Sequence, residues 1–305
     1  MDASDLSLPE GLAARALTTS DIEAIFEVVA ACQLADEGEV AIDRSDVRAD
    51  WARPDFDPRT MSRGIFDGRK LVAVAEVFQG RADVDVTPGH RGRGIGAALM
   101  RWTWEVARAD GRDEVTQFVS DDRPGAGALL EANGYRPVTE AWILRIDLAE
   151  EPPPPVLPEG IAFRDWVPGQ DDRRIYDVVH TAFAEFGHRS QGFGNWAVTT
   201  LRHEAASPEL VPLAVDGDRI IGVALGVDYG PSDPEGWVEH LAVERAYRGR
   251  GIGGALLRES FRRFRRAGKP RAGLSTNSDT GALGLYEHVG MHVERSYTRY
   301  AKRLT

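Results

Sequence analysis

The chain has 305 residues, of which 42% are hydrophobic and 28% are charged, and its net charge is −11. This length predicts two domains, and this composition is typical of a globular protein, not of a disordered or fibrous one. No apolar run approaches the ~20 residues of a membrane helix, the N-terminus has no signal-peptide segment, and Cys32 alone cannot form a disulfide framework or a cysteine zinc site, so a cytoplasmic protein is expected.

The charge is unevenly divided between the halves of the chain. Residues 1–150 hold 17 lysines and arginines against 28 aspartates and glutamates, a net charge of −11, whereas residues 151–305 hold 20 of each. This balance argues against general binding to nucleic acid or anionic membranes. It would suit a cationic partner, although a solvated acidic surface is the simpler interpretation.

The first half predicts a helix, three strands, and then alternating helices and strands. Ser20 to Glu23 has the spacing of a capping box, and Ile25, Phe26 and Val29 would share one face of the helix that follows. The later elements are expected as strands at 63–66, 71–77 and 82–86, a helix at 94–109, a strand at 115–120, a helix near 125–132 and a strand at 141–148.

A proline-rich segment interrupts the chain near its midpoint. Residues 152–155 are consecutive prolines, which cannot join a helix or a central strand and favour a stiff spacer. We therefore expect a linker at 150–160 between an N-terminal domain at 1–149 and a C-terminal domain at 161–305.

The second half repeats the first. The hexapeptide RGRGIG at 91–96 recurs unchanged at 248–253, an offset of 157 residues. The expected elements are a helix at 175–186, strands at 211–215, 219–227 and 237–243, a helix at 251–267, a strand at 272–276, a helix at 280–288 and a strand at 295–304. Their order predicts an α/β fold with a mixed sheet in each of two tandem copies of one domain.

Each glycine loop follows a strand and opens a helix. Glycines let the backbone approach a ligand closely, and the N–H groups at a helix start favour phosphate. The side chains of Arg91, Arg93, Arg248 and Arg250 would add charge-assisted donors. A nucleoside-triphosphate loop is excluded because both copies lack Gly-Lys-Ser/Thr, and a dinucleotide loop fits poorly because the glycines lie deep in each copy, after several strands.

The arrangement resembles the GNAT family of acetyl-CoA-dependent N-acetyltransferases. The family loop, Arg/Gln-x-x-Gly-x-Gly/Ala, is matched by Arg91-x-x-Gly94-x-Gly96 and Arg248-x-x-Gly251-x-Gly253. A second family motif is matched by Asp279-x-x-Ala282-x-x-Leu285-Tyr286-x-x-x-Gly290-Met291, with Asp in place of Asn and Met in place of Phe.

The resemblance implies acetyl-CoA as cosubstrate and no metal, and no pair of histidines has convincing metal-ligand spacing. In the C-terminal copy the implied cosubstrate-binding residues are Leu241, Ala242, Val243, Arg248, Gly249, Arg250, Gly251, Ile252, Gly253, Gly254 and Asp279. In the N-terminal copy they are Val84, Val86, Arg91, Gly92, Arg93, Gly94, Ile95 and Gly96.

Acetyl transfer to an amine requires two proton movements. The amine, with a pKa near 10.4 if lysine-like, must lose a proton, and the departing thiolate benefits from gaining one. The resemblance assigns these roles to Glu239, on the strand before the second loop, and to Tyr286, at the position of the family's general acid. The alternatives are a surface glutamate and a half-buried tyrosine on an amphipathic helix.

The N-terminal copy lacks both groups, because Ala82 and Leu130 occupy the corresponding positions. Asp83 and Asp85 alternate to the opposite face of the strand from Ala82, which argues against them as substitutes. We therefore expect this copy to bind acetyl-CoA or CoA, or to be purely structural, without catalysing transfer.

These observations predict an N-acetyltransferase whose C-terminal copy moves an acetyl group from acetyl-CoA to a small-molecule primary amine by direct attack. A tandem subfamily with the same architecture acetylates a cysteinyl amine carried on a sugar, and this acceptor is an alternative. A non-catalytic acyl-CoA sensor or scaffold is a second alternative. The two copies would pack together as a pseudo-dimer within a monomer.

Overall fold

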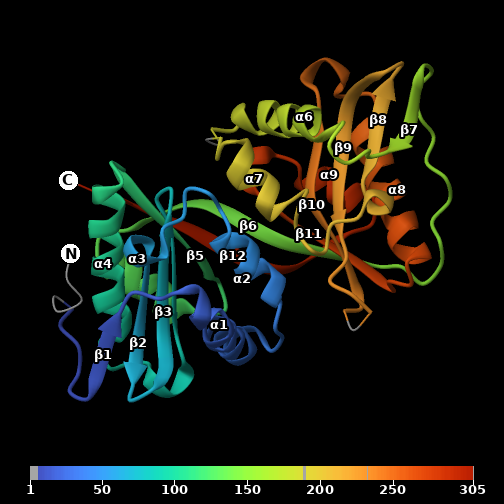
Figure 1. Cartoon of the computed structure of the whole chain (residues 1–305). Helices are drawn as coiled ribbons and strands as arrows, with labels where there is room; N and C mark the ends of the chain where they lie inside the picture. Colours follow the sequence, from blue (N-terminus) through green and yellow to red (C-terminus); the bar gives the residue numbers. More distant parts are fainter. Residues whose placement is uncertain (1–5, 188–189, 232, 305) are drawn as a thin grey trace. The chain divides into compact units, whose positions relative to one another are not determined.

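The computed structural model describes residues 6–187, 190–231 and 233–304. The chain forms two compact units (Figure 1): unit 1 is Met1–Thr139 with Tyr297–Thr305, and unit 2 is Glu140–Ser296. These bounds differ from the division at 149 and 161 that the linker suggests. The end of the first repeat belongs to unit 2 and the end of the second repeat belongs to unit 1, because the last strand of each repeat pairs in the other repeat's sheet.

Unit 1 contains a mixed sheet. The strands β1 (Leu12–Arg15), β2 (Ser62–Asp67), β3 (Lys70–Phe78) and β4 (Arg81–Val86) are successive antiparallel neighbours. β4 runs parallel to β5 (Glu114–Ser120), which pairs antiparallel with the second half of β12 (His292–Arg303). The helices are α1 (Ile22–Glu37), α2 (Arg44–Trp51), α3 (Pro58–Met61), α4 (Ile95–Ala109) and α5 (Pro124–Ala132).

Unit 2 repeats this arrangement. The strands β7 (Ile161–Asp165), β8 (Pro212–Asp216), β9 (Arg219–Val227) and β10 (Glu235–Val243) are successive antiparallel neighbours. β10 runs parallel to β11 (Arg271–Asn277), which pairs antiparallel with the second half of β6 (Arg136–Asp147). The helices are α6 (Asp172–Ala184), α7 (Phe193–Thr199), α8 (Ile252–Arg266) and α9 (Leu283–His288).

Helices cover both faces of each sheet. In unit 1, α4 packs on one face through Leu99, while α1 and α2 pack on the other through Val28 and Trp51. In unit 2, Phe261 of α8 lies in the core on one face of the sheet, and Trp196 of α7 lies in the core on the other face. The expected α/β fold with a mixed sheet in each copy is confirmed.

The structure adds short elements to those expected. β1, α2, α3, β7 and α7 were not predicted from the sequence, and the predicted elements differ from the observed ones by a few residues at their ends. The start of α1 also differs, because a 3-10 turn at Thr19–Asp21 precedes it and the Thr18 N–H donates to the Asp21 carboxylate at 2.8 Å. The cap therefore lies two residues earlier than the expected box from Ser20 to Glu23.

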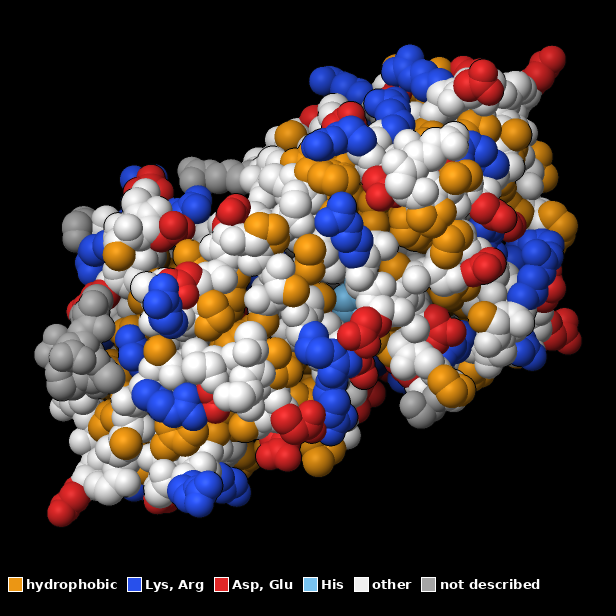
Figure 2. All heavy atoms as spheres, in the orientation of Figure 1, with side chains coloured by type: hydrophobic (Ala, Val, Ile, Leu, Met, Phe, Trp, Pro, Cys, Tyr) orange, Lys and Arg blue, Asp and Glu red, His pale blue; other side chains and the backbone are white. Residues whose placement is uncertain are grey.

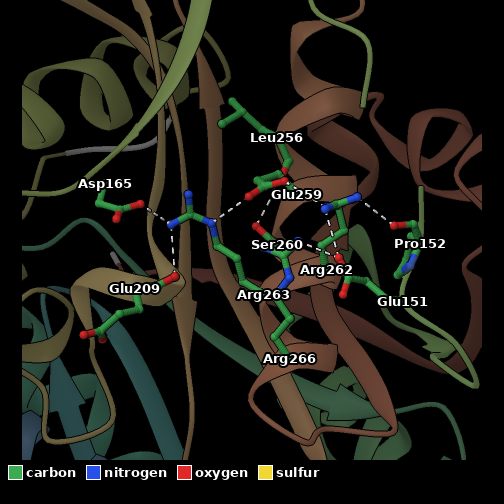
Figure 3. Close-up of polar contacts among 10 residues, drawn as sticks. All are labelled: Glu151, Pro152, Asp165, Glu209, Leu256, Glu259, Ser260, Arg262, Arg263 and Arg266. Carbon is green, nitrogen blue, oxygen red and sulfur yellow. Dashed lines mark hydrogen bonds and ion pairs between the residues drawn. The ribbon is translucent and has the colours of Figure 1, made fainter. Parts of the chain in front are cut away.

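The proline-rich linker is anchored to unit 2. Arg262 of α8 donates to the Pro152 carbonyl oxygen at 3.0 Å, and the Glu151 carboxylate lies 2.9 Å from Arg262 and 2.6 Å from Arg266 (Figure 3). Cations at a helix C-terminus are favoured by the helix dipole. The arginine-rich end of α8 therefore fixes the segment that leads into the second repeat.

On the face drawn in Figure 2, basic and acidic side chains are interspersed and no large patch of one sign is visible. No helix in the described ranges is long and apolar enough to cross a membrane. Within these same ranges, no group of three or more His, Cys, Asp or Glu side chains is arranged to hold a metal ion.

Candidate active site

The two glycine loops have the same backbone conformation. Gly94 precedes α4 with φ 84° and ψ −5°, and Gly251 precedes α8 with φ 81° and ψ −1°. This left-handed conformation favours glycine. A Cβ built at either position meets no atom within 4 Å, so the space beside each loop is open. The first N–H groups of each helix lack intrahelical acceptors, and a phosphate could accept from them there.

The first arginine of each loop braces the loop. Arg91 Nε donates to the Val86 carbonyl oxygen at 2.9 Å, and Arg248 Nε donates to the Val243 carbonyl oxygen at 2.9 Å. Their guanidinium groups also pair with the first helix region of each unit, Arg91 with Asp36 at 2.6 Å and Arg248 with Glu185 at 2.9 Å.

The second arginine of each loop is placed differently. Arg93 and Arg250 are exposed, whereas Arg91 and Arg248 already have anionic partners. The isoleucines between the glycines, Ile95 and Ile252, are each 1% exposed and belong to the cores. Phosphate binding would therefore fall to backbone N–H groups and to the second arginine.

Glu239 is the extra residue of a β-bulge. The pairing of β10 with β9 shifts register between Val238 and His240, whereas β4 pairs with β3 in continuous register from Ala73↔Val86 to Phe78↔Arg81. Bulges are common beside active sites because they re-aim a side chain. The side chain of Glu239 is exposed.

Side chains alternate between the two faces of the sheet in the part of β10 that follows this bulge. The Trp196 indole N–H of α7 donates to His240 Nε2 at 3.2 Å, while Leu241 and Val243 pack against the core that contains α8. His240 therefore faces α7, on the opposite side of the sheet from Leu241 and Val243.

The parallel pairing of β10 with β11 covers only the start of β10. It runs from Glu235↔Arg271 to Val238↔Leu274, although β10 continues to Val243. In unit 1 the parallel pairing of β4 with β5 is limited to Arg81↔Thr116. Within the described residues, each glycine loop is thus preceded by a strand segment that is paired on one side. A cosubstrate could lie along the unpaired side of this strand segment.

Tyr286 comes from the helix that follows β11. Its side chain is 7% exposed and packs in the core that contains α8. Burial raises the pKa of the Tyr286 hydroxyl, and a hydrogen bond with Thr276 of β11 partly opposes this increase. The phenol is therefore protonated at neutral pH, as a proton donor must be. Asp279, also predicted to bind the cosubstrate, is exposed in the turn before α9.

Unit 1 contains a cavity of about 940 Å³ that is partly open to solvent. Six of the residues predicted to bind the cosubstrate in the N-terminal copy line this cavity: Val84, Val86, Arg91, Gly92, Gly94 and Gly96. Arg93 and Ile95 are not among its lining residues. The cavity also reaches α1, α2 and the exposed end of β5, through residues that include Cys32, Asp50 and Phe118.

The carboxylates of this cavity do not follow from the sequence. Glu76, Asp83 and Asp85 all line it, although the alternation of β4 argues against Asp83 and Asp85 as substitutes for Glu239. A signal for Glu76 was present, since it interrupts the apolar run from Leu71 to Phe78. Cys32 is 1% exposed and burial raises its pKa to about 12, so it is a packed residue and not an activated thiol.

Comparison with known proteins gives one family. The model of the "Acetyltransferase (GNAT) family" matches residues 23–135 and 175–291. The chain is 31% identical over 291 residues to a mycothiol acetyltransferase of Geodermatophilus obscurus, covering 86% of this chain and 90% of that one. It is 33% identical over 225 residues to a mycothiol acetyltransferase of Thermomonospora curvata, covering 72% and 70%.

Solved structures show the same tandem arrangement. A GCN5-related N-acetyltransferase from Sphaerobacter thermophilus is similar over 98% of this chain and 97% of its own, with 34% identity and a TM-score of 0.77. A tandem GNAT protein from the clavulanic acid biosynthesis pathway covers 96% and 99%, with 17% identity and a TM-score of 0.72, a likeness of fold.

Proposed function

The chain belongs to the acetyltransferase (GNAT) family and is an acyltransferase, and on that premise we propose that unit 2 transfers an acetyl group from acetyl-CoA to a small-molecule primary amine. The observation that carries this proposal is Glu239 on the β-bulge of β10, which unit 1 lacks. Tyr286 also supports the proposal. Its buried phenol lies in the helix after β11, and the pairing of β11 with β10 ends at Val238, before the end of β10.

Binding of acetyl-CoA would use the loop and the strand before it. The pyrophosphate would accept hydrogen bonds from the N–H groups at the start of α8, where Gly251 adopts the left-handed conformation. The pantetheine chain would lie along 241–243, the part of β10 beyond its pairing with β11. Acetyl-CoA is a substrate here and leaves as CoA.

The reaction would be a direct attack in a ternary complex. Glu239, directly or through water, accepts a proton from the ammonium group of the acceptor. The amine nitrogen then bonds to the thioester carbon, and backbone N–H groups stabilise the oxyanion. The carbon–sulfur bond breaks and the thiolate takes the proton of Tyr286. The nitrogen gives its second proton, through water, to the Tyr286 phenolate, and Glu239 releases its proton to solvent. The products are an N-acetylated amine and CoA.

The test measures CoA release from a panel of amines with the full chain and two variants. Glu239→Gln and Tyr286→Phe should each lower kcat/KM by about 10²-fold or more, as is typical for loss of a general base or acid. The dissociation constant of acetyl-CoA should stay within about threefold. Unchanged acetyl transfer by both variants would contradict the mechanism.

The acceptor of the relatives suggests a specific candidate. Several relatives are named mycothiol acetyltransferase, so the amine of the desacetylated cysteinyl-glucosaminyl-inositol precursor belongs first in the panel. Turnover of this precursor well above simple amines would support that acceptor. Absence of turnover would remove it while leaving the general proposal to the remaining amines.

A non-catalytic role in binding acyl-CoA remains the second candidate, because the 940 Å³ cavity lies in unit 1, which lacks Glu239 and Tyr286 equivalents. If no amine in the panel elicits CoA release while the full chain binds acetyl-CoA, this alternative replaces the enzymatic proposal for unit 2.

A further inference from the structure

The direction of the Glu239 side chain depends on how the bulge of β10 is held. Val238 pairs with Gly226 of β9, and the next pair along the two strands joins His240 to Leu225. Between these two pairs β10 has one residue more than β9, and that residue is Glu239. A bulge locally disrupts the ladder of a sheet. The orientation of Glu239 is therefore set by what holds its two neighbours.

The two neighbours of Glu239 are held on opposite faces of the sheet. Val238 is 3% exposed and belongs to the core that contains α8. His240 points to the other face, where the Trp196 indole N–H of α7 donates to its Nε2 at 3.2 Å. The bulge is thereby fixed from both sides, by apolar packing on one face and by a hydrogen bond on the other.

Trp196 is a rigid anchor for this hydrogen bond. Its side chain is buried in the core between the sheet and α6. Its ring meets Tyr176 edge-on at 5.4 Å and His180 edge-on at 5.6 Å, measured between ring centroids. The Thr200 hydroxyl donates to the Trp196 carbonyl oxygen at 2.6 Å. A ring packed on several sides has little freedom, so Trp196 presents its N–H in a fixed direction.

The hydrogen bond also defines the state of the His240 ring. An indole nitrogen can only donate, so Nε2 of His240 accepts and the proton of the neutral imidazole lies on Nδ1. Phe183 packs edge-on against the same imidazole, with ring centroids 5.8 Å apart. His240 is therefore a neutral acceptor that ties β10 to α7.

Unit 1 has a different group at the corresponding position. His240 lies three residues before Val243, the end of β10. In unit 1, Asp83 lies three residues before Val86, the end of β4, and its carboxylate is 3.2 Å from Arg81. β4 pairs there with β3 in continuous register. The tie through a histidine therefore occurs in the unit that has the bulge and the glutamate.

We infer that His240 is a positioning residue for the proposed reaction. Through its bond to Trp196 it holds the bulge so that Glu239 points at the ammonium group of the acceptor. This inference rests on the function proposed for unit 2. His240 itself neither gives nor takes a proton in the reaction. The competing explanation is that the histidine only fills space beside α7.

A residue that acts through Glu239 matters only when the acceptor has a proton to lose. Ethylamine is protonated at neutral pH, because a lysine-like pKa is about 10.4. Trifluoroethylamine has nearly the same shape, but its fluorines withdraw electrons and leave its nitrogen largely unprotonated. Loss of the bond to Trp196 should therefore slow transfer to ethylamine and spare transfer to trifluoroethylamine, whereas loss of packing would slow both alike.

The experiment compares kcat/KM for these two amines at neutral pH in the full chain and its variants. His240→Phe keeps a ring and loses the acceptor nitrogen, so kcat/KM should fall about tenfold for ethylamine and less than about threefold for trifluoroethylamine. His240→Gln offers an oxygen that can accept from Trp196 and should stay within about threefold for both amines. His180→Phe changes another ring packed on Trp196 and is the matched control, with both values unchanged.

Two further measurements test the route of the effect. In the Glu239→Gln background, His240→Phe should cause less than about a twofold further loss, because the group that it positions is already gone. The Trp196 indole N–H resonance of the ¹⁵N-labelled chain reports the hydrogen bond itself. This resonance is assigned with Trp196→Phe, and it should shift more in His240→Phe than in His240→Gln.

Equal losses for both amines in His240→Phe would overturn the inference, and so would a full further loss in the Glu239→Gln background. If Glu239→Gln slows transfer to ethylamine and His240→Phe does not, only the positioning role fails. If Glu239→Gln leaves that transfer unchanged, the proposed base fails and the inference fails with it. Thermal unfolding establishes that each variant is folded. Should His240→Phe not fold, Trp196→Phe removes the donor in its place and should give the same pattern.

Discussion

At the scale of single residues, the first arginine of each glycine loop has a structural role that the identical sequences of the two loops do not reveal. Arg91 and Arg248 match the first letter of the family loop, which suggested phosphate binding, yet both hold a strand-end carbonyl and an acidic partner. The sequence predicts where such an arginine lies, but it does not predict its partner, because Asp36 and Glu185 are 55 and 63 residues away.

The bracing role of Arg248 gives a double-mutant test. Arg248→Met and Glu185→Gln should both weaken CoA binding, Arg248→Met by about tenfold, and their coupling should correspond to about 0.2–1 kcal/mol, typical of a partly exposed ion pair. The measurement is the dissociation constant of CoA for both single variants and the double variant. If Arg248 contacts phosphate without help from Glu185, the two effects will be additive.

Glu76 predicts a pH dependence of stability. Its pKa is about 8 in the folded chain against 4.5 ordinarily, so the protonated form is favoured by folding. The stabilisation is therefore complete below pH 4.5 and is lost as the pH rises through 8. At 1.36 kcal/mol per pKa unit, Glu76→Gln should gain up to roughly 5 kcal/mol relative to the unaltered chain between pH 4.5 and 9.

This difference is measured by urea unfolding of both chains at several pH values. A difference for Glu76→Gln that does not grow with pH would show that Glu76 is ionised in the folded chain at neutral pH.

At the scale of elements, hydrophobic patterning was sufficient for the long helices and the central strands. α4 and α8, the strands before them and the strands after them lie where periodicity and turn residues predicted. α3 has four residues and α7 has seven, too few to display a helical period. The bulge at Glu239 was also beyond prediction, because strict alternation assumes one residue opposite one residue.

The two glycine loops have the same conformation, so the same substitution made in each loop tests which unit catalyses acetyl transfer. Gly251→Ala and Gly94→Ala each force an alanine into a left-handed conformation at the same helix position, with no atom within 4 Å of the new Cβ. Each should cost about 1–2 kcal/mol of local stability. Only Gly251→Ala should lower kcat/KM for acetyl transfer, by about tenfold.

The readouts are thermal unfolding and steady-state kinetics of the two variants side by side. Equal losses of activity would show that both loops serve the reaction. A loss confined to Gly94→Ala would move catalysis to unit 1 and would contradict the proposal for unit 2.

At the scale of the whole molecule, the repeat in the sequence and the compact units do not coincide. The offset of 157 residues was visible in the sequence, but no signal in it shows that residues 297–303 pair with β5 and residues 141–147 with β11. Which strands pair is decided by the packing of the folded chain, and a sequence repeat alone does not specify this.

The last strand of each repeat pairs in the sheet of the other repeat, and this exchange of strands predicts how fragments of the chain behave. Residues 1–149 alone would leave β5 without its neighbour 297–303, and residues 150–305 alone would leave β11 without its neighbour 141–147. An unpaired strand edge promotes aggregation. Each fragment should be largely insoluble by itself, whereas the two co-expressed should form a soluble one-to-one complex, measured by size-exclusion chromatography with light scattering. Soluble, folded single fragments would contradict this prediction.

The same exchange also sets the order in which the protein can be completed on the ribosome. The last strand of unit 1 follows the whole of the second repeat in the sequence and is therefore synthesised after it. At about 5–20 residues per second, roughly 10–30 s separate the synthesis of the body of unit 1 from that of its closing strand. During this interval β5 has an open edge, and a ribosome that stalls within the second repeat leaves the first one unfinished. Unit 1, the earlier one in the sequence, is therefore the later one to be closed.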